Sequence, residues 1–107
     1  MPLPECVLVV HTRVPAERED AFNLWYDEVH LPEITNCPGF LRSARYVTDD
    51  GDGRRYLALY ELADEGALES DLFSARRGLG EFTGEAEISV QLFHQRITIE
   101  HEDEPAP

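Results

Sequence analysis

The sequence predicts an α+β fold in which strands and helices follow one another in the order β-α-β-β-α-β. Two observations lead to this prediction: four stretches rich in β-branched and aromatic residues, and two segments whose apolar residues recur at helical spacing. The chain has 107 residues, 42 % of them hydrophobic, which suits one domain with a packed core. We therefore expect a single domain over residues 1–100, followed by an acidic flexible tail over residues 101–107.

The first strand and the first helix open the chain. The strand is expected over Cys6–Val14, a β-branched and apolar run without a breaker, whose apolar side chains point to both faces. Pro15 then begins a helix with an acidic first turn, as the helix dipole favours. The residue before Pro32 is biased out of the helical region, so we expect this helix to end near Leu31.

The second and third strands are expected to form a hairpin. They cover Phe40–Thr48 and Arg54–Leu62, and an exposed loop of Asp and Gly residues joins them. Strict alternation places Arg42 and Tyr46 on the same face as the first residue of the second strand, and Arg45 on the other face. Which arginine faces a pocket stays open at this point.

A second helix and a fourth strand complete the order. Asp64 is the expected N-cap, and Gly78 and Gly80 end the helix. The fourth strand is expected over Ile88–Glu100 and is apolar on both faces. The simplest arrangement is ferredoxin-like: a four-stranded antiparallel sheet with both helices on one face. The bare apolar sheet face then predicts a homodimer in which two copies pack sheet to sheet.

Charge and composition argue against several classes of partner. The net charge of −13, from 22 acidic and 9 basic residues, argues against nucleic acid and against an anionic membrane surface. No apolar run is long enough to span a bilayer or to serve as a signal region, so we expect a cytoplasmic protein in which Cys6 and Cys37 stay reduced.

The motifs of metal and cofactor sites are missing from the sequence. The histidines are scattered and show neither a His-x-His nor an H-E-x-x-H spacing, so we expect no metal site. There is no glycine-rich phosphate loop, and we expect no bound cofactor. For haem, His30 and His94 would be the candidate axial ligands, although no motif marks either.

One stretch, Phe22–Phe40, combines aromatic residues with a histidine. On a helix, Phe22, Tyr26 and His30 form one stripe, and Trp25 broadens it into an apolar face. Such a stripe usually belongs to a core, with the histidine capping the helix. The alternative is a pocket wall, with an ionisable group at the end of an aromatic surface.

The residues of this stretch resemble those of a known superfamily. The run W-Y-x-x-x-H-L-P-E-I at Trp25–Ile34, then P-G-F at Pro38–Phe40 and R-Y-L-A-L-Y-E-L at Arg55–Leu62, resembles the dimeric α+β barrels, most of all their EthD-like branch. The resemblance implies a homodimer with one pocket per subunit, lined by the first helix.

Superfamily members include cofactor-free polyketide cyclases, quinone-forming monooxygenases and haem enzymes. In the cyclases, a helix-end histidine precedes Leu-Pro and an arginine follows on the next strand. Here these are His30 and either Arg42 or Arg45.

The residues and the resemblance together suggest a small cofactor-independent enzyme that binds an aromatic or polyketide-like ligand. We expect proton-transfer chemistry (cyclisation, dehydration, decarboxylation or isomerisation), with His30 as the acid or base. Tyr60 and Arg45 are the candidate partners of a developing oxyanion, with Tyr46 and Tyr56 as the alternative tyrosines. His11 is a second candidate catalytic histidine. The candidate substrate-binding residues are Phe22, Trp25, Tyr26, Arg42, Tyr46 and Phe73.

Two alternatives stay open from the sequence. The first is a cofactor-free monooxygenase on the same fold, whose substrate itself activates dioxygen. The second is a homodimeric protein that binds apolar ligands without turning them over. Because one fold hosts many functions, the sequence ranks the three in this order by a narrow margin only.

Overall fold

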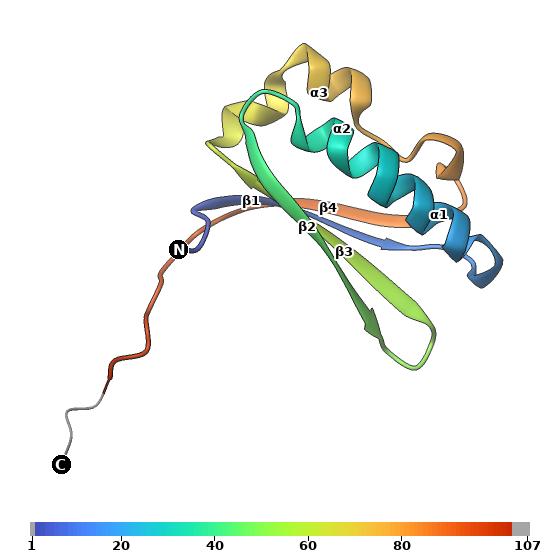
Figure 1. Cartoon of the computed structure of the whole chain (residues 1–107), viewed down its shortest axis with the longest axis horizontal. Coiled ribbons are helices and arrows are strands. Elements are labelled where there is room, and N and C mark those ends of the chain that lie inside the picture. Colours follow the sequence, from blue (N-terminus) through green and yellow to red (C-terminus); the bar gives the residue numbers. More distant parts are fainter. Residues whose placement is uncertain (1, 104–107) are drawn as a thin grey trace.

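The structure, a computed structural model, describes residues 2–103 and confirms the predicted ferredoxin-like α+β fold. The strands are β1 (Cys6–Arg13), β2 (Phe40–Asp49), β3 (Arg54–Leu62) and β4 (Glu87–His94). They form one antiparallel sheet in the order β2-β3-β1-β4. The helices lie together over one face of this sheet (Figure 1). Of the predicted acidic tail, residues 104–107 lie outside the described part of the chain.

The hydrophobic core fills the space between the helices and the sheet. The two central strands, β1 and β3, contribute the side chains of alternate residues to it, as the period of a strand requires. These core residues of the sheet are Cys6, Leu8, Val10, Ala58, Tyr60 and Leu62. The helical side contributes Phe22, Tyr26, Ile34, Phe73 and Phe82.

The first helical segment runs farther than predicted. It consists of a 3₁₀ turn (Ala16–Arg18), α1 (Glu19–Trp25), a π-helical turn (Tyr26–His30) and α2 (Leu31–Thr35). The prediction that it ends just before Pro32 is therefore wrong. A proline ring within an α-helix collides with the carbonyl group four residues earlier. Here that carbonyl lies in the wider π-helical turn, and such turns accommodate local irregularities of this kind.

The predicted second helix is divided into two pieces. A 3₁₀ helix covers Glu65–Glu69, and α3 covers Asp71–Arg76. Asp64 caps the first piece as predicted, because its side chain accepts a hydrogen bond from a backbone N–H. Ser70 interrupts the segment and caps α3 by accepting a hydrogen bond from the N–H of Phe73 at 3.0 Å. The sequence prediction did not include this second cap.

The fourth strand is shorter than predicted. A 3₁₀ turn over Gly80–Phe82 leads toward β4, which ends at His94 rather than at residue 100. The reason is that β1, the neighbouring strand, begins at Cys6, which pairs with His94. The residues after His94 therefore have no residues of β1 with which to pair. Ile97 and Ile99 are accordingly exposed in an extended segment that leads away from the sheet (Figure 1).

A β-bulge in β2 places Phe40 on a different face from Arg42 and Tyr46, against the prediction that the three share one face. Phe40 pairs with Leu62 and Arg42 with Glu61, so one extra residue is inserted in β2. Beyond the bulge, Arg45 pairs with Ala58 of the inner face and lies on the helix side. Arg42 and Tyr46, which were predicted to share a face with Phe40, lie on the outer face instead.

No helix of residues 2–103 lies over the outer face of the sheet (Figure 1). His11 and Leu57 pair there, and Tyr46 and Phe93 are large exposed side chains. Arg42 is satisfied there by an ion pair with the neighbouring Glu61. Packing of a second copy against this face stays a prediction. Within residues 2–103, no helix is both long and apolar enough to cross a membrane.

Candidate active site

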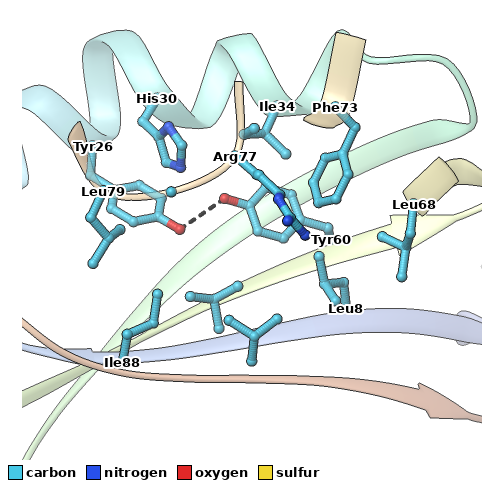
Figure 2. Close-up of a pocket in the computed structure, with 13 residues that line it drawn as sticks. Leu8, Tyr26, His30, Ile34, Tyr60, Leu68, Phe73, Arg77, Leu79 and Ile88 are labelled. Carbon is cyan, nitrogen blue, oxygen red and sulfur yellow. Dashed lines mark hydrogen bonds between the residues drawn. The ribbon is translucent and has the colours of Figure 1, made fainter. Parts of the chain in front are cut away.

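A cavity of about 410 Å³ lies between the helices and the inner face of the sheet (Figure 2). Its size falls within the range of small-molecule sites, roughly 300–1,000 Å³. Most of the lining is apolar, and comes from Leu8, Val10, Ile34, Leu68, Phe73, Leu79, Ile88 and Val90. Four side chains with polar groups also line it: Tyr26, His30, Tyr60 and Arg77.

His30 lies at the end of the π-helical turn and is 5 % exposed. Its ring stacks on Trp25, with centroids 4.6 Å apart and an interplanar angle of 15°, and meets Tyr26 edge-on at 4.9 Å. Burial lowers the pKa of the imidazole, and the negative charge of Glu33 opposes this only in part. Because the usual pKa is about 6.5, the His30 ring is neutral at physiological pH.

The His30 ring keeps its hydrogen-bonding capacity for a ligand. No hydrogen bond among residues 2–103 engages it, and its nitrogens are not among the fully buried atoms without a partner. Asp27 and Glu33, three residues before and after His30, are carboxylates at helical contact spacing from it. Asp27 is bound to Arg45 instead, at 2.7 Å. The orientation of His30 therefore depends on aromatic packing.

Tyr26 and Tyr60 form a buried pair of phenols on the cavity wall. Their hydroxyl oxygens are 2.9 Å apart, one from the helical segment and one from β3 (Figure 2). Burial raises the pKa of both phenols, so both are neutral at physiological pH. Each phenol has one O–H, so whichever donates to the other leaves one O–H to donate elsewhere. A ligand oxygen that gains negative charge in the cavity would meet this donor.

Arg45 stands behind the phenol pair and does not line the cavity. Its guanidinium donates to Asp27 at 2.7 Å and to Asn23 at 3.1 Å, and lies 4.4 Å from the centroid of the Tyr26 ring. Its positive charge acts to lower the pKa of Tyr26 and Tyr60, against the effect of burial. Arg45 therefore fixes the position of Tyr26 and makes the phenol pair a better hydrogen-bond donor.

The other predicted site residues divide between the cavity, the core and the outer face. Phe73 lines the cavity, as do His30, Tyr26 and Tyr60. Phe22 is fully buried in the core behind Tyr26. Trp25 is behind His30 and packs against Gly80, where even a Cβ atom would come within 3.3 Å of the indole.

Three predicted site residues are not brought to this cavity. His11 is exposed on the outer face of the sheet, because it alternates with the buried Val10 of the inner face. Arg42 and Tyr46 share that outer face because of the bulge in β2. The sheet separates all three from His30.

Arg77 is the polar lining residue that the sequence prediction did not include. It follows α3 and precedes Gly78, whose φ of 104° lies in the left-handed region that glycine favours. The Arg-Gly pair that ends the second helical segment was the available signal, but the sequence did not show which way the arginine points.

The described residues contain no group of three or more His, Cys, Asp or Glu side chains that could hold a metal ion. Cys6 and Cys37 are free and buried, and burial raises the pKa of both thiols. Neither thiol lines the cavity.

No protein-family model matches the sequence, and a search of curated proteins finds no match. Solved structures are similar in fold. SnoaB from Streptomyces nogalater, a cofactor-independent oxygenase, is 21 % identical with a TM-score of 0.62, covering 92 % of this chain and 100 % of its own. MhuD from Mycobacterium tuberculosis, a haem degrader with two haems in its active site, is 18 % identical with a TM-score of 0.64, covering 89 % and 99 %. The monooxygenase ActVA-Orf6 of Streptomyces coelicolor, in complex with nanaomycin D, is 17 % identical with a TM-score of 0.57, covering 92 % and 94 %. At these identities the comparisons establish the ferredoxin-like α+β fold, and they do not single out the EthD-like branch.

Proposed function

We propose that this protein is a cofactor-independent monooxygenase, which binds an aromatic, polyketide-like phenol in the cavity and oxidises it with dioxygen. One observation carries the proposal: a neutral, buried imidazole and a buried phenol pair lie on the wall of the same apolar cavity. Proton-transfer chemistry without oxygen was the first expectation from the sequence. The similar structures described as oxygenases give more support to the monooxygenase alternative.

The first step would be removal of a proton from the substrate by His30. Burial lowers the pKa of His30 below its usual value, which favours the neutral, proton-accepting form at neutral pH. The negative charge left on the substrate would spread onto an oxygen that accepts a hydrogen bond from the Tyr26–Tyr60 pair. The apolar lining excludes water and strengthens this interaction.

Oxidation would follow from the electron-rich anion itself. For an anthrone, the carbanion passes one electron to dioxygen, and the resulting radical and superoxide combine into a peroxide anion. This anion takes back the proton held by His30 and becomes a hydroperoxide. Loss of water from the hydroperoxide leaves a carbonyl group, so that one CH₂ and one O₂ become one C=O and one H₂O. The protein groups needed are one base and one oxyanion donor, which are the two functions available at this cavity.

Oxygen uptake with 1,8-dihydroxyanthrone tests the proposal. We expect one dioxygen consumed per quinone formed, in the presence of a metal chelator and without added flavin. His30→Gln should lower kcat/KM at least ~100-fold, the usual contribution of a general base. His94→Gln is the matched control, because His94 is exposed and lies outside the cavity.

The outcomes separate the three functions that the sequence left open. Unchanged oxygen uptake in His30→Gln would contradict the proposed base. Product formation under nitrogen by the wild type would instead favour proton-transfer chemistry without oxygen. Saturable binding of aromatic ligands with no turnover of any would favour a binding protein.

We also propose that a second copy covers the outer sheet face. Tyr46 is 57 % exposed and Phe93 47 % exposed there, next to apolar side chains of the central strands. Light scattering after gel filtration should give twice the chain mass of 12.2 kDa. Tyr46→Glu should shift the protein toward the monomer, whereas a monomeric wild type would rule out this assembly.

A further inference from the structure

Arg77 is the one charged side chain among the described residues that line the cavity. It is exposed to solvent and lies where the segment after α3 borders the cavity. In Figure 2 the Arg77 side chain is directed toward the space between the helices and the sheet. The remaining polar lining is the neutral cluster of Tyr26, His30 and Tyr60.

Arg77 lines the cavity without a carboxylate partner from the described residues. The protein carries 22 acidic residues against 9 basic ones, so carboxylates are abundant partners. Five arginines form ion pairs with carboxylates of the described residues: Arg13, Arg18, Arg42, Arg45 and Arg55. Four arginines, Arg54, Arg76, Arg77 and Arg96, form no such pair, and of these Arg77 alone is among the described residues that line the cavity, none of which is Asp or Glu. A guanidinium that faces an apolar cavity without a carboxylate partner is a binding group for an anion.

We propose that Arg77 binds a carboxylate group of the substrate at the edge of the cavity. This inference rests on the proposed function and narrows its substrate class to aromatic acids. The guanidinium would hold the carboxylate in two parallel hydrogen bonds. The opposite, neutral end of the ligand would lie against His30 and the phenol pair. Three contacts of different chemistry would then fix the ligand in one orientation.

The backbone around Arg77 is held in place. The N–H of Arg77 donates to the carbonyl of Phe73 at 2.8 Å, which closes the last turn of α3. Arg76 donates to the carbonyl of Glu33 at 3.1 Å and ties the end of α3 to α2. The chain then turns at Gly78, which adopts a φ of 104°. The backbone position from which the Arg77 side chain extends is therefore fixed relative to the helix that carries His30.

The net charge of the protein makes the contribution of Arg77 easier to detect when an acid and its ester are compared. A net charge of −13 repels an anionic ligand at long range. Without a local cation, a carboxylic acid should therefore bind more weakly than its neutral methyl ester. A preference for the acid would have to come from a positive group at the cavity, and Arg77 is the one available.

Calorimetric titration with a matched pair of ligands tests the inference. The pair is 1,4-dihydroxy-2-naphthoic acid and its methyl ester, titrated under nitrogen into the full chain so that no oxidation occurs. We expect wild type to bind the acid at least ~10-fold more tightly than the ester, as one charge-assisted pair allows. Arg77→Gln should bring the ratio to about one or below while leaving the Kd of the ester within about twofold. Arg77→Lys should retain part of the preference.

Arg96→Gln is the matched control, since it removes the same charge from an exposed position outside the cavity and should keep the wild-type ratio. Equal binding of acid and ester by the wild type would contradict the proposed carboxylate site without contradicting the proposed function. Selective binding of the acid with no oxygen uptake would overturn the function and leave the site standing. If neither ligand binds, both are overturned.

Discussion

The two faces of the sheet use ionisable side chains in different ways. On the inner face, Tyr60 is 1 % exposed and bonds to another buried phenol, and burial dominates the shift of its pKa. On the outer side, Asp50 accepts hydrogen bonds from Arg13 and Arg55, and pairing with Arg55 is the main cause of its lowered pKa. The same strands thus carry solvated ion pairs on one face and desolvated, neutral groups on the other. The desolvated groups of the inner face are the ones that line the cavity, where a ligand can exchange protons or hydrogen bonds with them.

The largest expected difference between buried and exposed positions is in packing. Phe82 is fully buried against Phe22 and Trp25, whereas Leu24 on α1 is 60 % exposed. Phe82→Ala should lower the free energy of unfolding by ~3–5 kcal/mol, because it leaves a cavity in the core. Leu24→Ala should change it by less than about 1 kcal/mol. Urea titrations measure both, and similar losses would contradict the described core.

The next largest difference in stability and activity is expected between substitutions of two tyrosines on opposite faces of the sheet. Tyr60→Phe removes the hydrogen-bond partner of the buried Tyr26 hydroxyl, so it should cost about 1–3 kcal/mol of folding stability. It should also lower the kcat of oxygenation roughly tenfold or more, because the Tyr26 hydroxyl loses the partner that holds the donor pair in place. Tyr46→Phe, on the outer face, should stay within about 0.5 kcal/mol and keep full activity. Equal activity of the two variants would show that the phenol pair plays no part in turnover.

The pH dependence of stability should report the burial of His30. Its pKa in the folded protein is below the unfolded value of about 6.5, so the unfolded chain binds the proton more readily. The stability that the neutral ring provides is therefore complete above pH ~6.5 and is lost as the pH falls below that value. Chemical denaturation at pH 7.5 and at lower pH should show this loss in the wild type, and a smaller loss in His30→Gln. An identical pH dependence of both proteins would contradict a lowered pKa.

The smallest expected effects concern the two arginines of β2. In the Arg45–Asp27 pair the Arg45 side chain is mostly buried and Asp27 is exposed to solvent. Asp27→Asn should therefore lower the free energy of unfolding by only about 0.5 kcal/mol. The outer pair is more exposed, and Arg42→Gln should cost about the same or less. The two variants should differ in activity, since Arg45 packs on Tyr26 and Arg42 does not approach the cavity. A modest fall in kcat for Asp27→Asn alone would support the positioning role of Arg45.

The sequence was sufficient for the order of elements because each of the four strands and both helical segments has its own pattern. It was insufficient wherever one inserted residue changes the geometry. The bulge before Arg42 exchanges the two faces of β2, and no turn residue in the strand signals it. In the same way, the π-helical turn lets the helix continue through Pro32, against the rule that predicted its end.

The candidate site was predictable in part. Helical spacing alone placed Tyr26 and His30 on one face, and both line the cavity together with Tyr60 and Phe73. His11 was misplaced because alternation along a strand that is apolar on both faces does not show which face the helices cover. Arg77 was missed because the direction of a side chain after a helix end depends on the turn at Gly78 and on the packing of α3.

The central claim, that His30 removes a proton from the bound substrate, can be tested before any oxygen reacts. The anion of 1,8-dihydroxyanthrone absorbs at longer wavelength than the neutral compound, so mixing the ligand with protein under nitrogen reports proton transfer directly. We predict that the wild type generates the bound anion at neutral pH and that His30→Gln binds the ligand in its neutral form. Equal formation of the anion by both proteins would contradict the assignment of His30 as the base.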